Sequence, residues 1–229
     1  MVLLGTIINT ISVAVGSTLG LLVGKSFSSK AQTGIVVIFG LFTLAISTLM
    51  VADMKEPIHI FIALVIGFLI GESLGLHTRF SNFAKRFDVE GEQSVANGFI
   101  KATLLFCVGG MTLVGCIDEG IRGDYKLISL KSLMDLISSF FLASALGRGV
   151  LFSSAGVFII QGSLTLAFFM IGALIPSELL ADLTATGGIL LLALGLDLID
   201  VKKFQILDLV PAFLILPIIH YAHIYLFSV

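Results

Sequence analysis

Asp135 is the residue that most suggests chemistry, because its carboxyl group stands inside a long apolar stretch. An ionisable side chain at membrane depth costs about 2.5–3.5 kcal/mol on insertion scales, so a functional role is the default hypothesis. Ser132 and Ser139 lie three residues before it and four residues after it, which places all three on one helix face. Oxygens of this kind suit a cation or a proton. The structural alternative is hydrogen bonding that only holds helices together.

Further amides and hydroxyls stand in other apolar stretches of the chain. They offer oxygen ligands without adding net charge. Together with Asp135, Ser132 and Ser139, we expect them to form an ion- or substrate-binding site: Asn9, Ser12, Thr43, Ser138, Gln161 and Thr165.

A second group of acids stands beside glycine-rich sequence. Asp118 and Glu119 follow a segment with three glycines, and glycine at this density allows a helix to break and expose carbonyls at a cavity mouth. The alternative, which we prefer, is a flexible helix end with solvated acids. Asp182 and Thr186 precede another glycine pair and are candidates for the same gating role. Asp182 alternatively caps its own helix.

The sequence shows no set of nucleophile, base and orienting group, so we expect no enzyme. Cys107 and Cys116 are its two cysteines, and their spacing fits neither a zinc site nor a disulfide framework. We therefore expect no metal site and no cofactor. The net charge of −2 offers no basic excess for a nucleic-acid partner.

The elements that position these residues must be membrane-spanning helices. Of the 229 residues, 57% are hydrophobic and 12% are charged, against about 25% charged residues in an ordinary globular domain. A bilayer core about 30 Å thick needs about 20 apolar residues per span. The sequence predicts an all-α polytopic bundle in the lipid bilayer, one domain over 1–229, with eight spans: 3–24, 34–52, 57–76, 97–117, 129–147, 149–175, 179–199 and 208–227.

The two halves of the chain resemble each other. Val37–Ala45 (VIFGLFTLA) aligns with Ile159–Ala167 (IIQGSLTLA), and two further blocks align in the same order. This predicts a four-plus-four internal repeat with halves of about 1–120 and 125–229. Because four spans return the chain to its starting side, the halves would be parallel, with the binding site between them.

Two runs of glycine recur at intervals of four residues. Small residues at this spacing line one helix face and let another backbone approach closely. The partner helix belongs either to the same chain or to a second copy in a homo-oligomer. The glycines expected to pack helices are Gly16, Gly20, Gly24, Gly67, Gly71 and Gly75.

The loop lysines and arginines predict an orientation. Loops after odd-numbered predicted spans hold eight of them and loops after even-numbered spans hold four, with Lys101 set aside because it lies inside the fourth span. Cytoplasmic loops are the richer in these residues. We therefore expect the odd-numbered loops to be cytoplasmic and both termini to be outside.

Several motifs together resemble the YqgA/YdfK-like family of bacterial inner-membrane proteins, a domain of unknown function. The resemblance covers nearly the whole chain. It implies a multi-pass membrane protein for which transport is the usual guess, and it supplies no substrate or catalytic residues. The motifs are Leu4–Asn9 (LGTIIN), Leu104–Gly110 (LLFCVGG), Lys131–Asp135 (KSLMD), Gln161–Thr165 (QGSLT) and Leu183–Gly188 (LTATGG).

The resulting functional hypothesis is a transporter or channel for an ion or small solute in the bacterial inner or plasma membrane. Its site would lie around Asn9, Asp135 and Gln161. The alternative is a membrane scaffold or partner subunit that assembles through its glycine faces. An intramembrane enzyme is a distant third.

Overall fold

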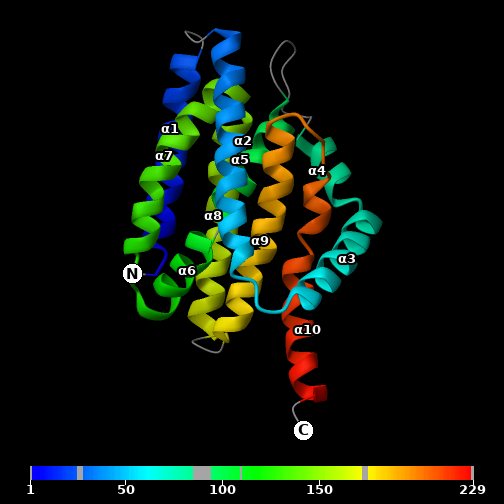
Figure 1. The fold of residues 1–229 in the computed structure, drawn as a ribbon. Coiled ribbons are helices and arrows are strands. Elements are labelled where there is room, and N and C mark those ends of the chain that lie inside the picture. Colours follow the sequence, from blue (N-terminus) through cyan, green and yellow to red (C-terminus); the bar gives the residue numbers. More distant parts are fainter. Residues whose placement is uncertain (1, 25–27, 85–93, 109, 172–174, 228–229) are drawn as a thin grey trace.

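The fold is a bundle of helices, seen in a computed structural model (Figure 1). The structure describes residues 2–24, 28–84, 94–108, 110–171 and 175–227. All regular secondary structure in these ranges is helical. In chain order the elements are α1 (Leu4–Gly24), α2 (Ser29–Ala52), α3 (Pro57–Leu74), α4 (Leu76–Ala84), α5 (Val95–Cys107), α6 (Gly110–Ile117), the π-helix η2 (Asp118–Arg122), α7 (Lys126–Leu146), α8 (Gly149–Ile171), α9 (Ser177–Leu198), the 3-10 helix η3 (Ile206–Leu209) and α10 (Ala212–Phe227).

The helices confirm the predicted polytopic bundle. Seven of them are long and apolar enough to cross a bilayer, and there are eight spans if the bent pair of α5 with α6 and η2 counts as one. Successive spans run in alternate directions, so both termini lie at the same end of the bundle (Figure 1). We call this end the terminal face. The connection from α2 to α3, the end of α8 and the start of α9 also lie there.

Local sequence sets the helix ends. The hydroxyl of Ser28 accepts a hydrogen bond from the N–H of Ala31 at the start of α2, which satisfies one of the donors that a helix start leaves open. Pro57 begins α3, where its missing N–H costs nothing. Gly75 ends α3 with a φ of +59°, a left-handed conformation that favours glycine.

The outer surface of the bundle is apolar, as a lipid environment requires. Leu49 on α2 is 68% exposed and Met170 on α8 is 83% exposed, and many other large apolar side chains face outward. By contrast, α9 is enclosed: 67% of its most apolar stretch is buried, against 22% for α2. α9 is thus the central helix, and α2 lies at the periphery.

The predicted fourth span is broken. α5 ends at Cys107, and the segment from Met111 to Arg122 is bent by 58° relative to it. The hydroxyl of Thr112 donates to the carbonyl of Phe106 across the break, at 3.1 Å. Of the two interpretations of this glycine-rich segment, the break is the one that the structure supports.

Most of the predicted packing glycines lie at helix contacts within the chain. A Cβ on Gly16 or Gly20 would collide with the backbone of α7, and one on Gly67 or Gly71 would collide with the backbone at Ala212 or Asp208. Both of these glycine faces, on α1 and on α3, are therefore occupied by segments of the same chain. Gly24 is the last residue of α1.

Gly75 departs from the predicted packing role. A Cβ there would meet nothing within 4 Å. Its left-handed φ shows that it is present for the turn after α3.

The internal repeat stays a prediction. A parallel repeat maps α2 onto α8 and α3 onto α9, so the pairing of α2 with α9 would recur as a pairing of α8 with α3. α2 packs along α9, but in the described ranges α3 packs along α10 and α8 packs along α5 and α1. The helix packing thus gives the two halves different neighbours.

Candidate functional site

Lys131 and Asp135 form a buried ion pair on α7. They are one helical turn apart, which places both side chains on the same face. Each residue is only 6% exposed. Asp135 is the tenth of the 21 residues of α7, so the pair lies near the middle of its span. A lone charge at this depth would be costly, and each charge neutralises the other.

Lys131 is a site residue that the sequence hypothesis missed. It was counted among the loop cations although it lies inside a predicted span. Its spacing of four residues from Asp135 is the signal that would have identified it.

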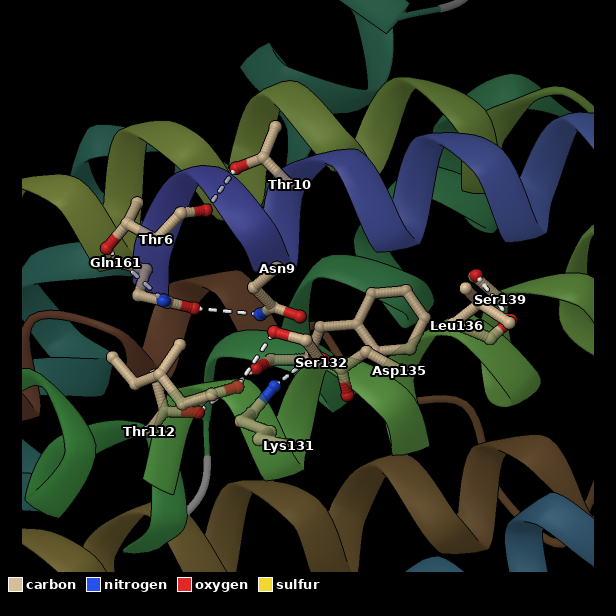
Figure 2. A network of polar contacts seen from close by, with 12 residues as sticks. Thr6, Asn9, Thr10, Thr112, Lys131, Ser132, Asp135, Leu136, Ser139 and Gln161 are labelled. Atoms are coloured by element: carbon tan, nitrogen blue, oxygen red, sulfur yellow. Dashed lines mark hydrogen bonds and ion pairs between the residues drawn. The ribbon is translucent and has the colours of Figure 1, made fainter. Parts of the chain in front are cut away.

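Amide groups of α1 and α8 lie behind the ion pair (Figure 2). The Nδ2 of Asn9 donates to the Oε1 of Gln161 at 2.9 Å, and the Nε2 of Gln161 donates to the Oγ1 of Thr6 at 3.3 Å. Asn9 also lies beside Asp135. The structure therefore brings together the predicted trio of Asn9, Asp135 and Gln161, and adds Thr6.

The predicted hydroxyl ligands divide into two groups. Ser132 and Ser139 donate to carbonyls of their own helix, those of Ile128 and Leu136. Such bonds satisfy the hydroxyl protons within the helix. Thr43 and Ser138 line a cavity beside the ion pair, although the hydroxyl of Thr43 also donates within its helix, to the carbonyl of Phe39.

Thr165 and Ser12 lie away from this cavity. The hydroxyl of Thr165 is 3.5 Å from that of Thr6. Ser12 is half-buried on α1.

A cavity of about 380 Å³ lies between α2, the broken span, α7 and α9. Phe39, Phe42, Met50 and Phe106 are among the aromatic and aliphatic side chains that form most of its wall. Such a volume and lining are typical of small-molecule sites. Its polar and charged lining residues are Thr43, Asp53, Thr112, Lys131, Asp135, Ser138 and Thr184.

The cavity reaches toward the terminal face. Asp53 caps the end of α2 there and is exposed, whereas Lys131 and Asp135 lie deep in the bundle. Next to the cavity, buried apolar side chains of α1, α5, α7 and α8 form a packed cluster that includes Ala102, Phe106 and Leu146. Several lining residues, among them Phe42, Leu49 and Met134, are themselves exposed, so part of the wall belongs to the outer surface of the bundle.

The acids predicted to gate the cavity do not line it. Glu119 is fully buried, and its carboxylate accepts hydrogen bonds from the N–H of Gly5 and from the hydroxyl of Thr6. It therefore caps the start of α1 from η2, where the helix leaves backbone donors open and carries partial positive charge. Asp118 pairs with the exposed Arg122 at 2.9 Å. The preferred interpretation, solvated acids, is wrong for Glu119.

Asp182 also caps a helix, although not its own. Its Oδ1 accepts hydrogen bonds from the N–H groups of Lys55 and Glu56, at 2.7 and 3.1 Å, directly before α3. Thr186 donates to the carbonyl of Asp182 and stays within α9. The prediction that Asp182 caps its own helix is wrong because the donors come from a connection more than a hundred residues away.

Asp208 repeats this arrangement on the opposite face. Its buried carboxylate accepts a hydrogen bond from the N–H of His77, in the first turn of α4, at 2.9 Å. Glu119, Asp182 and Asp208 are thus three buried acids whose partners are the open backbone donors of other helices. We call them the capping acids.

A second network of charged side chains lies toward the face opposite the termini. Lys101 of α5, which is 6% exposed, lies 3.4 Å from Asp197 of α9. Lys203 lies 3.0 Å from Asp197 and 2.8 Å from Asp200. The hydrogen bond from Lys203 holds the pKa of Asp200 below its ordinary value, and Asp200 in turn raises the pKa of Lys203. This network ties α5 to the connection between α9 and η3.

Within the described ranges, no three His, Cys, Asp or Glu side chains gather closely enough to hold a metal ion. The groups that the cavity wall offers are the Lys131–Asp135 pair, the carboxylate of Asp53 and the hydroxyls of Thr43, Thr112, Ser138 and Thr184.

This fold defines a multi-pass helical membrane protein. A family model described as "Protein of unknown function (DUF554)" matches residues 4–221, and the chain belongs to this family. It is 32% identical over 219 residues to "Uncharacterized membrane protein YdfK" of Bacillus subtilis (strain 168), with 94% of each chain covered. It is 30% identical over 220 residues to "Uncharacterized protein YqgA" of Escherichia coli (strain K12), covering 93% of this chain and 94% of that protein.

The resemblance drawn from the motifs is thereby confirmed. No solved structure matches the chain.

Proposed function

We propose that this membrane protein is a non-enzymatic transporter of a small solute or ion, and that the cavity beside Lys131 and Asp135 is its binding site. The observation that carries the proposal is a buried ion pair that lines a cavity in the middle of the membrane span. A buried ion pair seldom stabilises a fold more than apolar residues of the same size would. Charged residues at this depth therefore favour a functional explanation.

The surroundings of the cavity favour a transporter over an open channel. A channel needs a continuous path, whereas alternating access needs a central site that is reached from one face at a time. Here the site leads toward Asp53 at the terminal face. The apolar core and the ion pair of Lys101 with Asp197 lie toward the other face.

The broken fourth span supports the same proposal. Interrupted helices in membranes occur where their unpaired backbone groups line a cavity or lie buried in protein. In transporters, such helices form the substrate site near the bilayer midplane. In this chain Phe106, Val108 and Thr112, on either side of the break, all line the cavity.

The decisive experiment is a flux assay with protein reconstituted in liposomes. The panel comprises protons, Na⁺, K⁺, a carboxylate, an amine and a zwitterionic amino acid. Asp135→Asn keeps an oxygen for Lys131 but removes the charge. We expect it to lower the flux of the transported species at least about tenfold, the weight of one charged hydrogen bond.

The matched control is Asp124→Asn. Asp124 is exposed and pairs at 3.8 Å with the exposed Lys126, the first residue of α7. Its removal should change flux by less than about twofold. Equal flux from Asp135→Asn and the native chain, or no protein-dependent flux of any panel member, would contradict the proposal.

The proposed location is the bacterial inner membrane with both termini outside. The predicted bias of loop cations supports this orientation. It becomes eight against three once Lys131 is removed from the four loop cations near the terminal face, because Lys131 is buried in α7. A C-terminal alkaline phosphatase fusion should be active and a C-terminal green fluorescent protein fusion should be dark. The reverse pattern would invert the orientation.

A further inference from the structure

The cavity holds a buried cation and a buried anion of the protein side by side, with the exposed carboxylate of Asp53 elsewhere in its wall. Lys131 and Asp135 both line it, and the wall around them is mostly apolar. Building on the proposed transport function, we infer that the cavity binds a zwitterion with an apolar body, an apolar α-amino acid or a compound of the same chemistry.

The charge balance of the ion pair favours a zwitterion over a solute with a single charge. The pair is neutral as a whole and buried. A solute with a single charge would attract one partner and leave the other without a counter-charge at membrane depth, where an unpaired charge is expensive. A zwitterion brings a carboxylate for Lys131 and an ammonium for Asp135. The site then stays neutral while the ion pair is exchanged for two new ones.

The spacing of the two charged side chains fits the charged groups of an α-amino acid. Side chains four residues apart on a helix have Cβ atoms about 5–6 Å apart. The two charged groups of an α-amino acid are attached to one carbon atom, so they are close enough together to meet both side chains at once. A dipeptide with free ends places its charges farther apart and fits this spacing less well.

Further hydrogen-bonding groups near the ion pair are available to an ammonium group. The Oδ1 of Asn9 is buried beside Asp135 and accepts no hydrogen bond from the described part of the chain. An ammonium group has three N–H donors, so it needs acceptors besides a carboxylate. The hydroxyls of Ser138 and Thr112 line the cavity itself, whereas Asn9 lies beside the pair and is not among the lining residues.

The apolar wall defines the rest of the solute. Phe39, Phe42, Phe106 and Met50 face the cavity, as do Met111 and Met134. Aromatic and thioether groups pack well against aliphatic and aromatic bodies. A volume of about 380 Å³ accommodates a side chain as large as that of phenylalanine.

The test uses solutes that differ by a single charged group. L-Phenylalanine is compared with 3-phenylpropanoate, which lacks the amine, and with 2-phenylethylamine, which lacks the carboxylate. L-Leucine, 4-methylpentanoate and 3-methylbutylamine form a second set. Binding to the detergent-purified chain is measured by titration calorimetry. In at least one set we expect the amino acid to bind at least about tenfold more tightly than either analogue.

Two variants should then invert the preference. Asp135→Asn removes the partner of the ammonium, so the carboxylate analogue should bind as well as the amino acid or better. Lys131→Gln removes the partner of the carboxylate, so the amine analogue should bind to this variant as well as the amino acid or better. If the pair had a purely structural role, both variants would bind all three solutes more weakly and to the same extent. The controls, Asp124→Asn and Lys126→Gln, should keep the native preference.

The outcomes separate this inference from the proposed function. If no amino acid is preferred over its analogues in either set, the inference is overturned. Flux of an ion that depends on Asp135 would then leave transport standing without it. If the amino acid binds with the expected preference but is not carried across liposomes, the site is supported and transport is contradicted.

Discussion

Buried acids serve two different purposes in this protein. The capping acids satisfy backbone donors of other helices and lie outside the cavity, whereas Asp135 pairs with a side chain and lines it. A backbone donor is part of the fold and cannot be exchanged for a solute. The partner of Asp135 is a side chain that can move. Burial alone therefore does not identify a functional carboxylate in a membrane protein. Asp135 is distinguished because its partner is a side chain and because it lines the cavity, whereas Asp197 pairs with Lys101 outside the cavity.

The largest effect on stability should come from Glu119→Ala. It would leave the N–H of Gly5 and the hydroxyl of Thr6 without their acceptor in a fully buried place. Two charged hydrogen bonds lost there correspond to about 3 kcal/mol, or a fall of about 6–12 °C in the unfolding midpoint. Thermal unfolding of the detergent-purified chain measures it.

Glu119→Gln is the matched control, because its amide oxygen can still accept one of the two bonds. It should lose less stability than Glu119→Ala. Flux per folded molecule should remain native-like in both variants. A loss of flux without a loss of stability would move Glu119 from the capping acids to the transport site.

A smaller, more local effect is expected for Asp182→Ala. The N–H groups of Lys55 and Glu56 would lose their acceptor, which destabilises the start of α3 by about 1–2 kcal/mol. Hydrogen-exchange mass spectrometry should show faster exchange at these amides. Asp208→Ala should do the same at His77 alone. Unchanged exchange at residues 55 and 56 would show that Asp182 does not hold this connection.

Features set by residues close together in the sequence could be predicted, whereas contacts between residues far apart in the sequence could not. The length of the apolar runs gave the spans, because each needs only local information. The long-range caps escaped prediction, since no spacing connects Asp182 to Lys55. The cavity wall escaped for the same reason: Asp53, Thr112 and Thr184 come from three different elements.

Local signals were also overlooked. Lys131 and Asp135 are four residues apart in the printed sequence, and that spacing predicts contact on a helix. Lys101 stands inside a predicted span, so it needed a partner such as Asp197. An inventory of every ionisable residue within the spans, cations included, would have found both pairs.

The smallest effect should come from Asp200→Asn on the face opposite the termini. Lys203 holds the pKa of the exposed Asp200 below its ordinary value, so this pair favours the folded state above the unfolded pKa of about 3.9. The contribution disappears as the pH falls through the lower, folded pKa. The variant should therefore lose slightly less stability than the native chain on acidification below about pH 4. If the native chain and the variant lose the same stability on acidification, the pairing of Asp200 with Lys203 does not contribute to folding.

Close packing through glycine divides the bundle into stiff blocks. α1 is held against α7 where Gly16 and Gly20 admit the backbone of α7, and Gly40 and Gly195 bring α2 and α9 together in the same way. Interlocked backbones resist sliding, so each pair moves as a single body. The cavity runs along the joint between these two bodies. In the proposed transport cycle, exposure of Lys131 and Asp135 to the other side of the membrane would come from one block tilting against the other.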